Sequence, residues 1–296
     1  MEPIQYFPAA KAPSNPYFSI LIPSWNNLAF LQLCIRSIRE HSVVPFELIV
    51  HLNEGKDGSL EWVRDQQDIA YTHSISNVGV CHAMNAMRQL AQADYLLYIN
   101  DDMYTLPGWD LLLQKEIQAC PNEYFFISST MIEPRAQSNC SIEANFGTSM
   151  DTFEEARLLA EFDAFEKADW HGATWPPNVV HKKMWDAVSG YSVEFTPGMY
   201  SDPDFSMKLW QAGVRLFKGL GQSRVYHFGS ISVKRVKQNR GYYQFIRKWG
   251  MTSSTLSKYY LRRGEQFDGP LVPQKIPLFV QLKNWYYRIS TARKTI

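Results

Sequence analysis

Short apolar runs alternate with amphipathic stretches over the first third of this chain. Residues 18–22 form an apolar run that Pro23 ends, which predicts a buried strand feeding a loop. Residues 28–41 carry apolar side chains at spacings of three and four, which predicts a helix packed by one face on a sheet. A second strand is predicted at 46–50. This order of strand, helix and strand favours a parallel sheet.

The same alternation continues to residue 99. A helix is predicted at 58–67, a third strand at 71–76 and a fourth strand at 95–99, with an amphipathic helix between the last two. The expected fold class is therefore α/β, with an open, mostly parallel sheet flanked by helices. Ligands bind such sheets where the strands end, so the polar residues that follow each strand are candidates for a site.

Polar residues do follow the predicted strands, at 23–27, Asn53 and Asn77 and at the pair Asp101 and Asp102. Carboxylates are ligands that Mg²⁺ and Mn²⁺ accept, so the acidic pair predicts a site for a metal-bound phosphate. A solvated turn is the alternative, because Asp and Asn form turns readily. The position of the pair directly after a buried run favours the metal site.

A tight turn is expected at Asn77 and Gly79, where a helix begins. The unpaired backbone N–H groups at such a helix end attract anions, which would bring the phosphates of a nucleotide close to this turn.

A second acidic cluster holds Asp202 and Asp204, and a single histidine, His227, follows it. Asp202 is a candidate general base. With Pro203 after it, Asp202 could also cap a helix at 205–212, since Asp at the N-cap followed by Pro is a common helix start. Asp204 would then lie in the first turn. His227 is either a metal ligand or a hydrogen-bonded structural residue.

Charge is divided unevenly along a chain whose net charge is only +1. Residues 224–296 hold 15 of the 30 Lys and Arg residues but only two of the 29 acidic residues, which predicts an acidic catalytic body with a basic extension beginning near Ser230. Residues 241–249 and 276–289 interleave aromatic with basic side chains. They are too short to span a bilayer but suit an anionic membrane surface. A helical lid or a dimer contact is the alternative, and no nucleic-acid-binding pattern accompanies them.

The four cysteines show no spacing typical of a zinc site or a disulfide framework, and residues 1–17 contain no continuous apolar segment. We therefore expect a cytoplasmic protein, with peripheral binding to the inner face of the cytoplasmic membrane as an option. The sequence does not determine the oligomeric state.

Taken in order, the motifs between residues 17 and 232 resemble those of family 2 glycosyltransferases, which have the nucleotide-sugar-binding GT-A fold. The resemblance implies inverting transfer of a sugar from a nucleotide diphosphate to a hydroxyl group. It assigns nucleotide-sugar binding to Pro23, Trp25, Asn26, Asn53, Asn77, Gly79, Asn85, Asn100 and Asp101. It assigns a divalent cation, Mn²⁺ or Mg²⁺, to Asp102 and His227, the catalytic base to Asp202, and the acceptor side to Trp170, His171, Gly172 and Asp204.

Two positions depart from the family pattern. Where the family usually has Asp-Asn-x-Ser after the second strand, residues 52–55 read Leu-Asn-Glu-Gly, so the aspartate that commonly contacts a uracil base is absent. The second departure is Ser201, which replaces the glutamate before Asp202. A UDP-sugar remains the expected donor, and a glycan or lipid-linked molecule of cell-surface polysaccharide synthesis is the expected acceptor.

The expected organisation is a leader at 1–17, a GT-A domain at 18–230 and a helical basic extension at 231–296. Two other functions stay open: a nucleotidyltransferase, and a non-catalytic module of the same fold that binds a glycan or nucleotide. A nucleotidyltransferase usually carries a Gly-rich, basic loop after its first strand, whereas residues 23–26 contain neither glycine nor charge. The joint presence of Asp102, Asp202 and His227 argues against the non-catalytic module.

Overall fold

The structure is a computed structural model that describes residues 3–136, 138–229 and 240–292. Its N-terminal elements are β1 (Gln5–Phe7), β2 (Phe18–Trp25), α1 (Leu28–His41), β3 (Phe46–Asn53), α2 (Ser59–Arg64), β4 (Ile69–Ser74), α3 (Gly79–Arg88), β5 (Tyr95–Tyr98), β6 (Met103–Thr105) and α4 (Trp109–Ala119). The elements that follow are β7 (Phe125–Glu133), β8 (Ile142–Glu143), α5 (Glu155–Glu161), β9 (Trp170–His171), β10 (Asn178–His181), α6 (Lys182–Ala187), α7 (Ser201–Gln211), β11 (Leu216–His227), α8 (Gly241–Trp249), α9 (Ser253–Thr255) and α10 (Leu278–Ala292).

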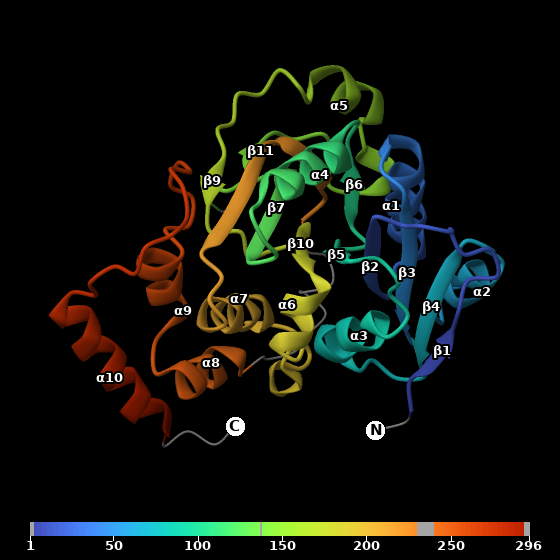
Figure 1. The fold of residues 1–296 in the computed structure, drawn as a ribbon. Coiled ribbons are helices and arrows are strands. Elements are labelled where there is room, and N and C mark those ends of the chain that lie inside the picture. Colours follow the sequence, from blue (N-terminus) through green and yellow to red (C-terminus); the bar gives the residue numbers. More distant parts are fainter. Residues whose placement is uncertain (1–2, 137, 230–239, 293–296) are drawn as a thin grey trace.

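One large sheet runs through the molecule in the order β1-β4-β3-β2-β5-β10-β7-β11-β6 (Figure 1). Strands β4, β3, β2 and β5 run parallel to one another, as do β7 and β11, whereas β1 is antiparallel to β4. Strand β10 runs antiparallel between β5 and β7, and β6 runs antiparallel to β11. The predicted α/β class with a mostly parallel sheet is confirmed.

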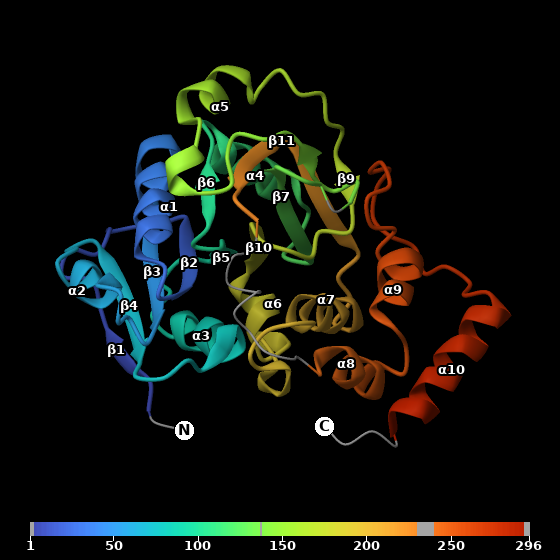
Figure 2. The same cartoon turned by 180° about the vertical axis from the view of Figure 1, so that it is seen from behind.

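Alternate residues of each central strand face opposite layers of the core. In β2, Ile20 and Ile22 join the cluster formed with α1 and α4, whereas Leu21 joins the cluster on the other face. That second cluster contains residues of α3, α6, α7 and α8, which lie together on one side of the sheet (Figures 1 and 2). The period of two along a strand is what divides one apolar run between two layers.

The limits of α1 are those predicted, but β2 does not stop at Pro23. The strand continues to Trp25, with Pro23 paired to His51 of β3. On the other side of β2, the pairing with β5 ends where Leu21 meets Tyr98. Pro23 therefore has a neighbouring strand on one side only, and a residue without an N–H is tolerated at such an edge position.

The C-terminal helices are fastened to the body of the molecule through α8. Asp204 of α7 accepts hydrogen bonds from Lys248 Nζ and Trp249 Nε1, each at 2.9 Å. The guanidinium of Arg247 in α8 donates to the backbone oxygen of Thr291 in α10 at 2.7 Å. The predicted domain boundary at Ser230 lies outside the described residues. On either side of it, the chain packs into the same layered structure.

No helix in the described part of the chain is both long and apolar enough to cross a membrane. The longest of the C-terminal helices, α10, has 15 residues and lies at the edge of the molecule beyond α8 and α9 (Figures 1 and 2).

Lys248→Met is expected to lower the free energy of unfolding by about 3 kcal/mol, because it leaves the fully buried Asp204 carboxylate without its cation. Urea denaturation measures the change. The matched control is Lys183→Met, which removes an exposed pair with Glu123 and is expected to lower the free energy of unfolding much less. Equal losses in the two variants would contradict a stabilising role for the buried pair.

Candidate active site

Asp101 and Asp102 occupy the turn between β5 and β6, and both side chains are buried. Ser24 at the end of β2 donates its hydroxyl proton to Asp101 Oδ2 at 2.6 Å. This bond joins the ends of two neighbouring parallel strands. The alternative of a solvated turn is therefore wrong, since a buried carboxylate must be compensated by specific partners.

His227 lies beside Asp102 because the last residues of β11 pair with β6, directly after the acidic turn. The distance from His227 Nε2 to Asp102 Oδ1 is 3.5 Å, and Nδ1 is 2.8 Å from Oε1 of Glu133 at the end of β7. Burial by itself lowers the pKa of His227, but the carboxylates of Asp102 and Glu133 outweigh it and raise the pKa to about 10. Sequence reasoning missed Glu133, although a carboxylate that ends a buried strand was an available signal.

These residues fit a divalent cation. Asp102 Oδ1 and His227 Nε2 face one another, and Glu133 fixes the imidazole through its other nitrogen, as carboxylates commonly do behind metal-binding histidines. Oxygen and imidazole donors suit Mn²⁺ or Mg²⁺. Across residues 3–136, 138–229 and 240–292, no three His, Cys, Asp or Glu side chains form a ready-made metal site. The protein would thus supply two ligands and leave other positions to phosphate and water.

Asp202 is the second residue of α7 and is partly buried. The predicted N-cap role is wrong, since the helix begins at Ser201 and follows Tyr200, whose φ is 68°. Burial raises the pKa of the Asp202 carboxyl to about 7, although a hydrogen bond from the Tyr191 hydroxyl, 3.0 Å from Oδ1, acts in the opposite direction. A carboxyl group with that pKa is suited to exchanging a proton near neutral pH.

Tyr98 connects the two acidic clusters. Burial raises the pKa of its phenol well above the usual value, and the negative charges of Asp202 and Asp102 raise it further. Its ring packs edge-on against Tyr191, with the ring centroids 6.2 Å apart. The candidate base and the candidate metal ligand therefore lie within electrostatic reach of one buried phenol at the end of β5.

Asn85 holds the backbone of Tyr191 in place. Its Nδ2 donates to the Tyr191 oxygen at 2.7 Å, and its Oδ1 accepts from the Tyr191 nitrogen at 2.9 Å. Gly190 has no side chain to interfere, whereas a Cβ there would lie 2.3 Å from Asn85 Oδ1. The structure thus places this predicted nucleotide-sugar residue behind Tyr191, where it positions the partner of Asp202.

Asn53 and Asn77 shape the loop that leads into α3. The Asn53 Oδ1 accepts from the Val78 nitrogen at 2.8 Å, and the Asn77 Oδ1 accepts from the Gly79 nitrogen at the same distance. Asn26 likewise binds the backbone of a second loop, because its Oδ1 accepts a hydrogen bond from the Lys56 nitrogen at 2.9 Å. These amides therefore hold the loops at the strand ends in shape.

The start of α3 is not the open anion site that the sequence predicted. Gly79 has a φ of 78°, and a Cβ there would lie 2.7 Å from the Cα of Pro197. The Val80 nitrogen donates to the Pro197 oxygen at 3.0 Å. The loop before α7 thus covers this helix end and uses one of its N–H groups.

Three residues predicted to line the acceptor side instead pack beneath the C-terminal segment. The Trp170 Nε1 donates to Thr130 Oγ1 at 2.8 Å. His171 is fully buried with its Nε2 2.7 Å from Asp268 Oδ1, and a Cβ on Gly172 would lie 2.7 Å from the Cα of Arg263. Sequence reasoning could not foresee this, because the covering residues lie about a hundred positions downstream.

The remaining predicted residues divide between the site and the protein interior. Pro23, Trp25 and Asn100 are partly buried and lie at or next to the same strand ends as Ser24 and Asp101. Asp204, predicted to line the site, is fully buried and faces α8. The resemblance also matches the segment from His227 to Ser232 with the histidine segment that closes the family's domain, and Ser232 lies outside the described residues.

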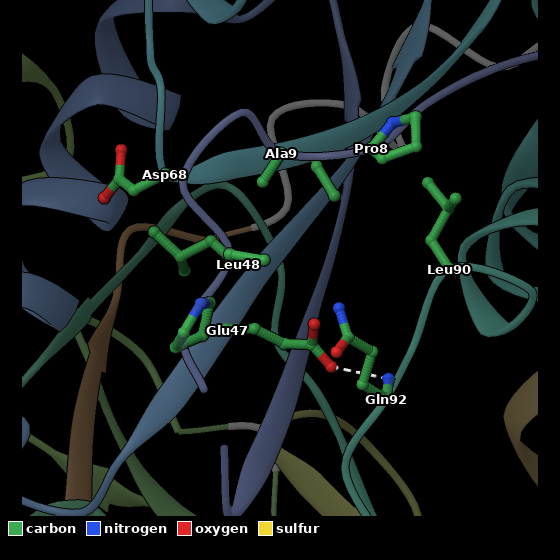
Figure 3. A pocket seen from close by; sticks show the side chains of 10 residues that line it. Pro8, Ala9, Glu47, Leu48, Asp68, Leu90 and Gln92 are labelled. Atoms are coloured by element: carbon green, nitrogen blue, oxygen red, sulfur yellow. Dashed lines mark hydrogen bonds between the residues drawn. The ribbon is translucent and has the colours of Figure 1, made fainter. Parts of the chain in front are cut away.

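A small cavity of about 50 Å³ lies away from these groups, where β3 begins (Figure 3). The backbone nitrogen of Gln92 donates to the Glu47 carboxylate at 2.6 Å, and Ser19 donates to the same oxygen. Glu47 is thus a structural residue that ties the strand to the segment before β5.

Sequence comparison gives a family and a relative. Residues 19–138 match the model of Glycosyl transferase family 2. The putative colanic acid biosynthesis glycosyl transferase WcaA of Escherichia coli (strain K12) is 31% identical over 97 residues, which are 30% of this chain and 33% of that protein. The match thus spans about a third of the curated relative.

Structural comparison extends the likeness over most of the chain. The crystal structure of S. aureus TarS 1-349 in complex with UDP-GlcNAc has a TM-score of 0.56 at 11% identity, covering 93% of this chain and 72% of that one. GalNAc-T7 with UDP, GalNAc and Mn²⁺ has a TM-score of 0.58 at 14% identity, covering 82% and 50%. At these identities the likeness concerns the fold. Residues 19–138 therefore match glycosyl transferase family 2, within a chain that has the GT-A fold.

Proposed function

We propose that this protein is an inverting glycosyltransferase. It would move a sugar from a UDP-sugar to a hydroxyl group of a glycan or lipid-linked acceptor in cell-surface polysaccharide synthesis. One observation carries the proposal: the charges of Asp202 and Asp102 both raise the pKa of the buried Tyr98 phenol, so the two carboxyl groups lie near the same side chain. The pKa of Asp202 itself is about 7. The family match and the UDP-bound structural neighbours support the donor class.

Asp202 would act as the general base. An acceptor hydroxyl loses its proton to the carboxylate while its oxygen forms a bond to the anomeric carbon and the bond from that carbon to the phosphate oxygen breaks. Because attack and departure occur on opposite faces of the sugar, the configuration inverts. Tyr191 holds Oδ1 and leaves the other carboxylate oxygen to the acceptor. A pKa near the working pH is what general-base catalysis favours.

Asp102 and His227 would hold the divalent cation. When bound, the ion neutralises the negative charge that grows on the departing diphosphate. Glu133 keeps the imidazole oriented so that Nε2 faces Asp102. The imidazole ligand favours Mn²⁺ over Mg²⁺. Ser24 keeps the neighbouring Asp101 turned toward the end of β2.

We propose that the enzyme is a cytoplasmic protein that acts at the inner face of the cytoplasmic membrane, to which it binds peripherally. A lipid-linked acceptor would be presented there. The basic C-terminal segment supports this assignment, because 15 of the 30 Lys and Arg residues lie in residues 224–296.

Asp202→Asn is expected to lower the rate of sugar transfer by about 10²–10⁴-fold, because the amide cannot accept the acceptor proton. Release of UDP from a UDP-sugar in the presence of acceptor measures it. UDP affinity with Mn²⁺ should stay nearly unchanged, and Asp65→Asn, at an exposed position, should keep full activity. Full turnover by Asp202→Asn would remove this residue from the base role.

Asp102→Asn is expected to abolish the part of UDP binding that depends on Mn²⁺. A ligand bound to the folded protein raises its melting temperature, so thermal-shift assays with and without the metal report the difference. The same assay with GDP, CDP and dTDP tests the preference for uridine. An unchanged metal-dependent shift in the variant would exclude Asp102 as a ligand.

The value of kcat/KM is expected to be constant above pH 7 and to fall about tenfold per pH unit below it, because only the deprotonated Asp202 accepts a proton. Tyr191→Phe removes a hydrogen bond that lowers the pKa of Asp202, so the acidic limb should move to higher pH. Tyr6→Phe, at an exposed position in β1, serves as the control. An acidic limb that does not move in Tyr191→Phe would contradict this pairing.

A further inference from the structure

Helix α10 carries a continuous apolar face that nothing in the described structure covers. The side chains on this face are between 41% and 70% exposed, although all are large and apolar or aromatic. They recur at the spacings of three and four that put residues on one side of a helix. They are Leu278, Phe279, Leu282, Trp285, Tyr286 and Ile289.

The opposite face of α10 is bound to the rest of the protein. Val280, Asn284 and Thr291 are its buried residues. Asn284 Oδ1 accepts hydrogen bonds from the Thr252 nitrogen at 3.2 Å and the Thr255 hydroxyl at 3.0 Å. The helix is thus held with its apolar face outward. It lies at the edge of the molecule (Figures 1 and 2).

The charges around this face have one sign. Residues 269–292 contain no Asp or Glu, whereas Lys275, Lys283 and Arg288 are all exposed. At 100° per residue, Lys283 and Arg288 fall on the two sides of the apolar face. An apolar strip between cations complements a surface that is apolar inside and negatively charged outside.

We propose that α10 docks the protein on an anionic membrane surface, lying in the plane of the interface. At 15 residues the helix is about 22 Å long, less than the roughly 30 Å of the hydrocarbon core, so it would lie on the bilayer instead of spanning it. Trp285 and Tyr286 suit the headgroup level, where an aromatic ring has apolar and polar surroundings together. Lys283 and Arg288 would contact lipid phosphates.

A second copy of this chain fits the same face less well. Pairing two such helices would bring the Lys283 and Arg288 side chains of both copies together. Residues 269–292 contain no acidic residue to offset them. An anionic lipid surface satisfies both the apolar strip and the cations.

Docking through α10 would also orient the candidate active site. Arg247 of α8 binds the end of α10, and Lys248 of the same helix binds Asp204 in α7, which carries Asp202. These contacts connect α10 to α8 and α8 to α7, the helix that carries the candidate base. This orientation of Asp202 toward a membrane-borne acceptor rests on the proposed function, whereas the docking itself does not.

Flotation of the full-length protein with lipid vesicles tests the proposal. Binding is expected to vesicles of phosphatidylcholine and phosphatidylglycerol in roughly equal parts and to be much weaker to pure phosphatidylcholine. It should weaken in about 0.5 M NaCl, where surface charges are screened. Changing Phe279→Glu together with Trp285→Glu should lower binding by about tenfold or more, because both side chains would leave water on docking.

The control pair is Val43→Glu with Tyr124→Glu, which changes two exposed apolar side chains outside α10 and should leave vesicle binding intact. Equal melting temperatures would show that both double variants fold. Unchanged binding by the α10 variant would overturn the proposal. The proposal would also be overturned if the wild-type protein formed a dimer that the α10 variant disrupts and neither protein bound vesicles. Sugar transfer to a soluble acceptor is measured separately, so a failure of the proposed function is distinguishable from a failure of docking.

Discussion

The structure depends on compensating negative charge that is buried at one end of a parallel sheet. Asp101 and Asp102 follow β5, and Glu133 ends β7. All three carboxylates are buried. Unpaired, such carboxylates would cost several kcal/mol each. Ser24 and His227 provide the compensation through short contacts, and the surrounding strand ends must keep their register for those contacts to exist. The same arrangement that stabilises the fold also fixes the geometry of the candidate metal ligands.

The sequence predicts the elements and strand ends of the N-terminal part of the chain well. The limits of α1 follow from its apolar spacing, and Asp101 and Asp102 follow from their position after the buried run of β5. The limits of α1 are confirmed and the acidic pair lies at the strand end as expected, because both depend on residues that are close together in the chain. The metal-binding role of the pair stays a prediction. His227 is identified by family resemblance, and its partner Glu133, 94 residues away, is visible only once β7 and β11 pair.

Predictions failed where distant chain segments decide the environment. Gly79 and Val80 look like an open helix end until Pro197 is seen against them. His171 looks like a pocket residue until Asp268 covers it. Tyr191 gives no sequence signal at all, since its role depends on Asn85 holding its backbone. Local pattern therefore predicts elements and strand-end residues, whereas second partners and covering segments require the folded chain.

The contact between α7 and α8 has a practical consequence for anyone who shortens this protein. A fragment that stops after β11 would retain every motif of the family resemblance up to His227 and would look like a sensible minimal catalytic unit. It would nevertheless lack Lys248 and Trp249, the two side chains that bind the buried Asp204. A fragment with boundaries drawn from family motifs alone would thus leave this buried carboxylate without those two partners, and α8 belongs inside any trimmed version.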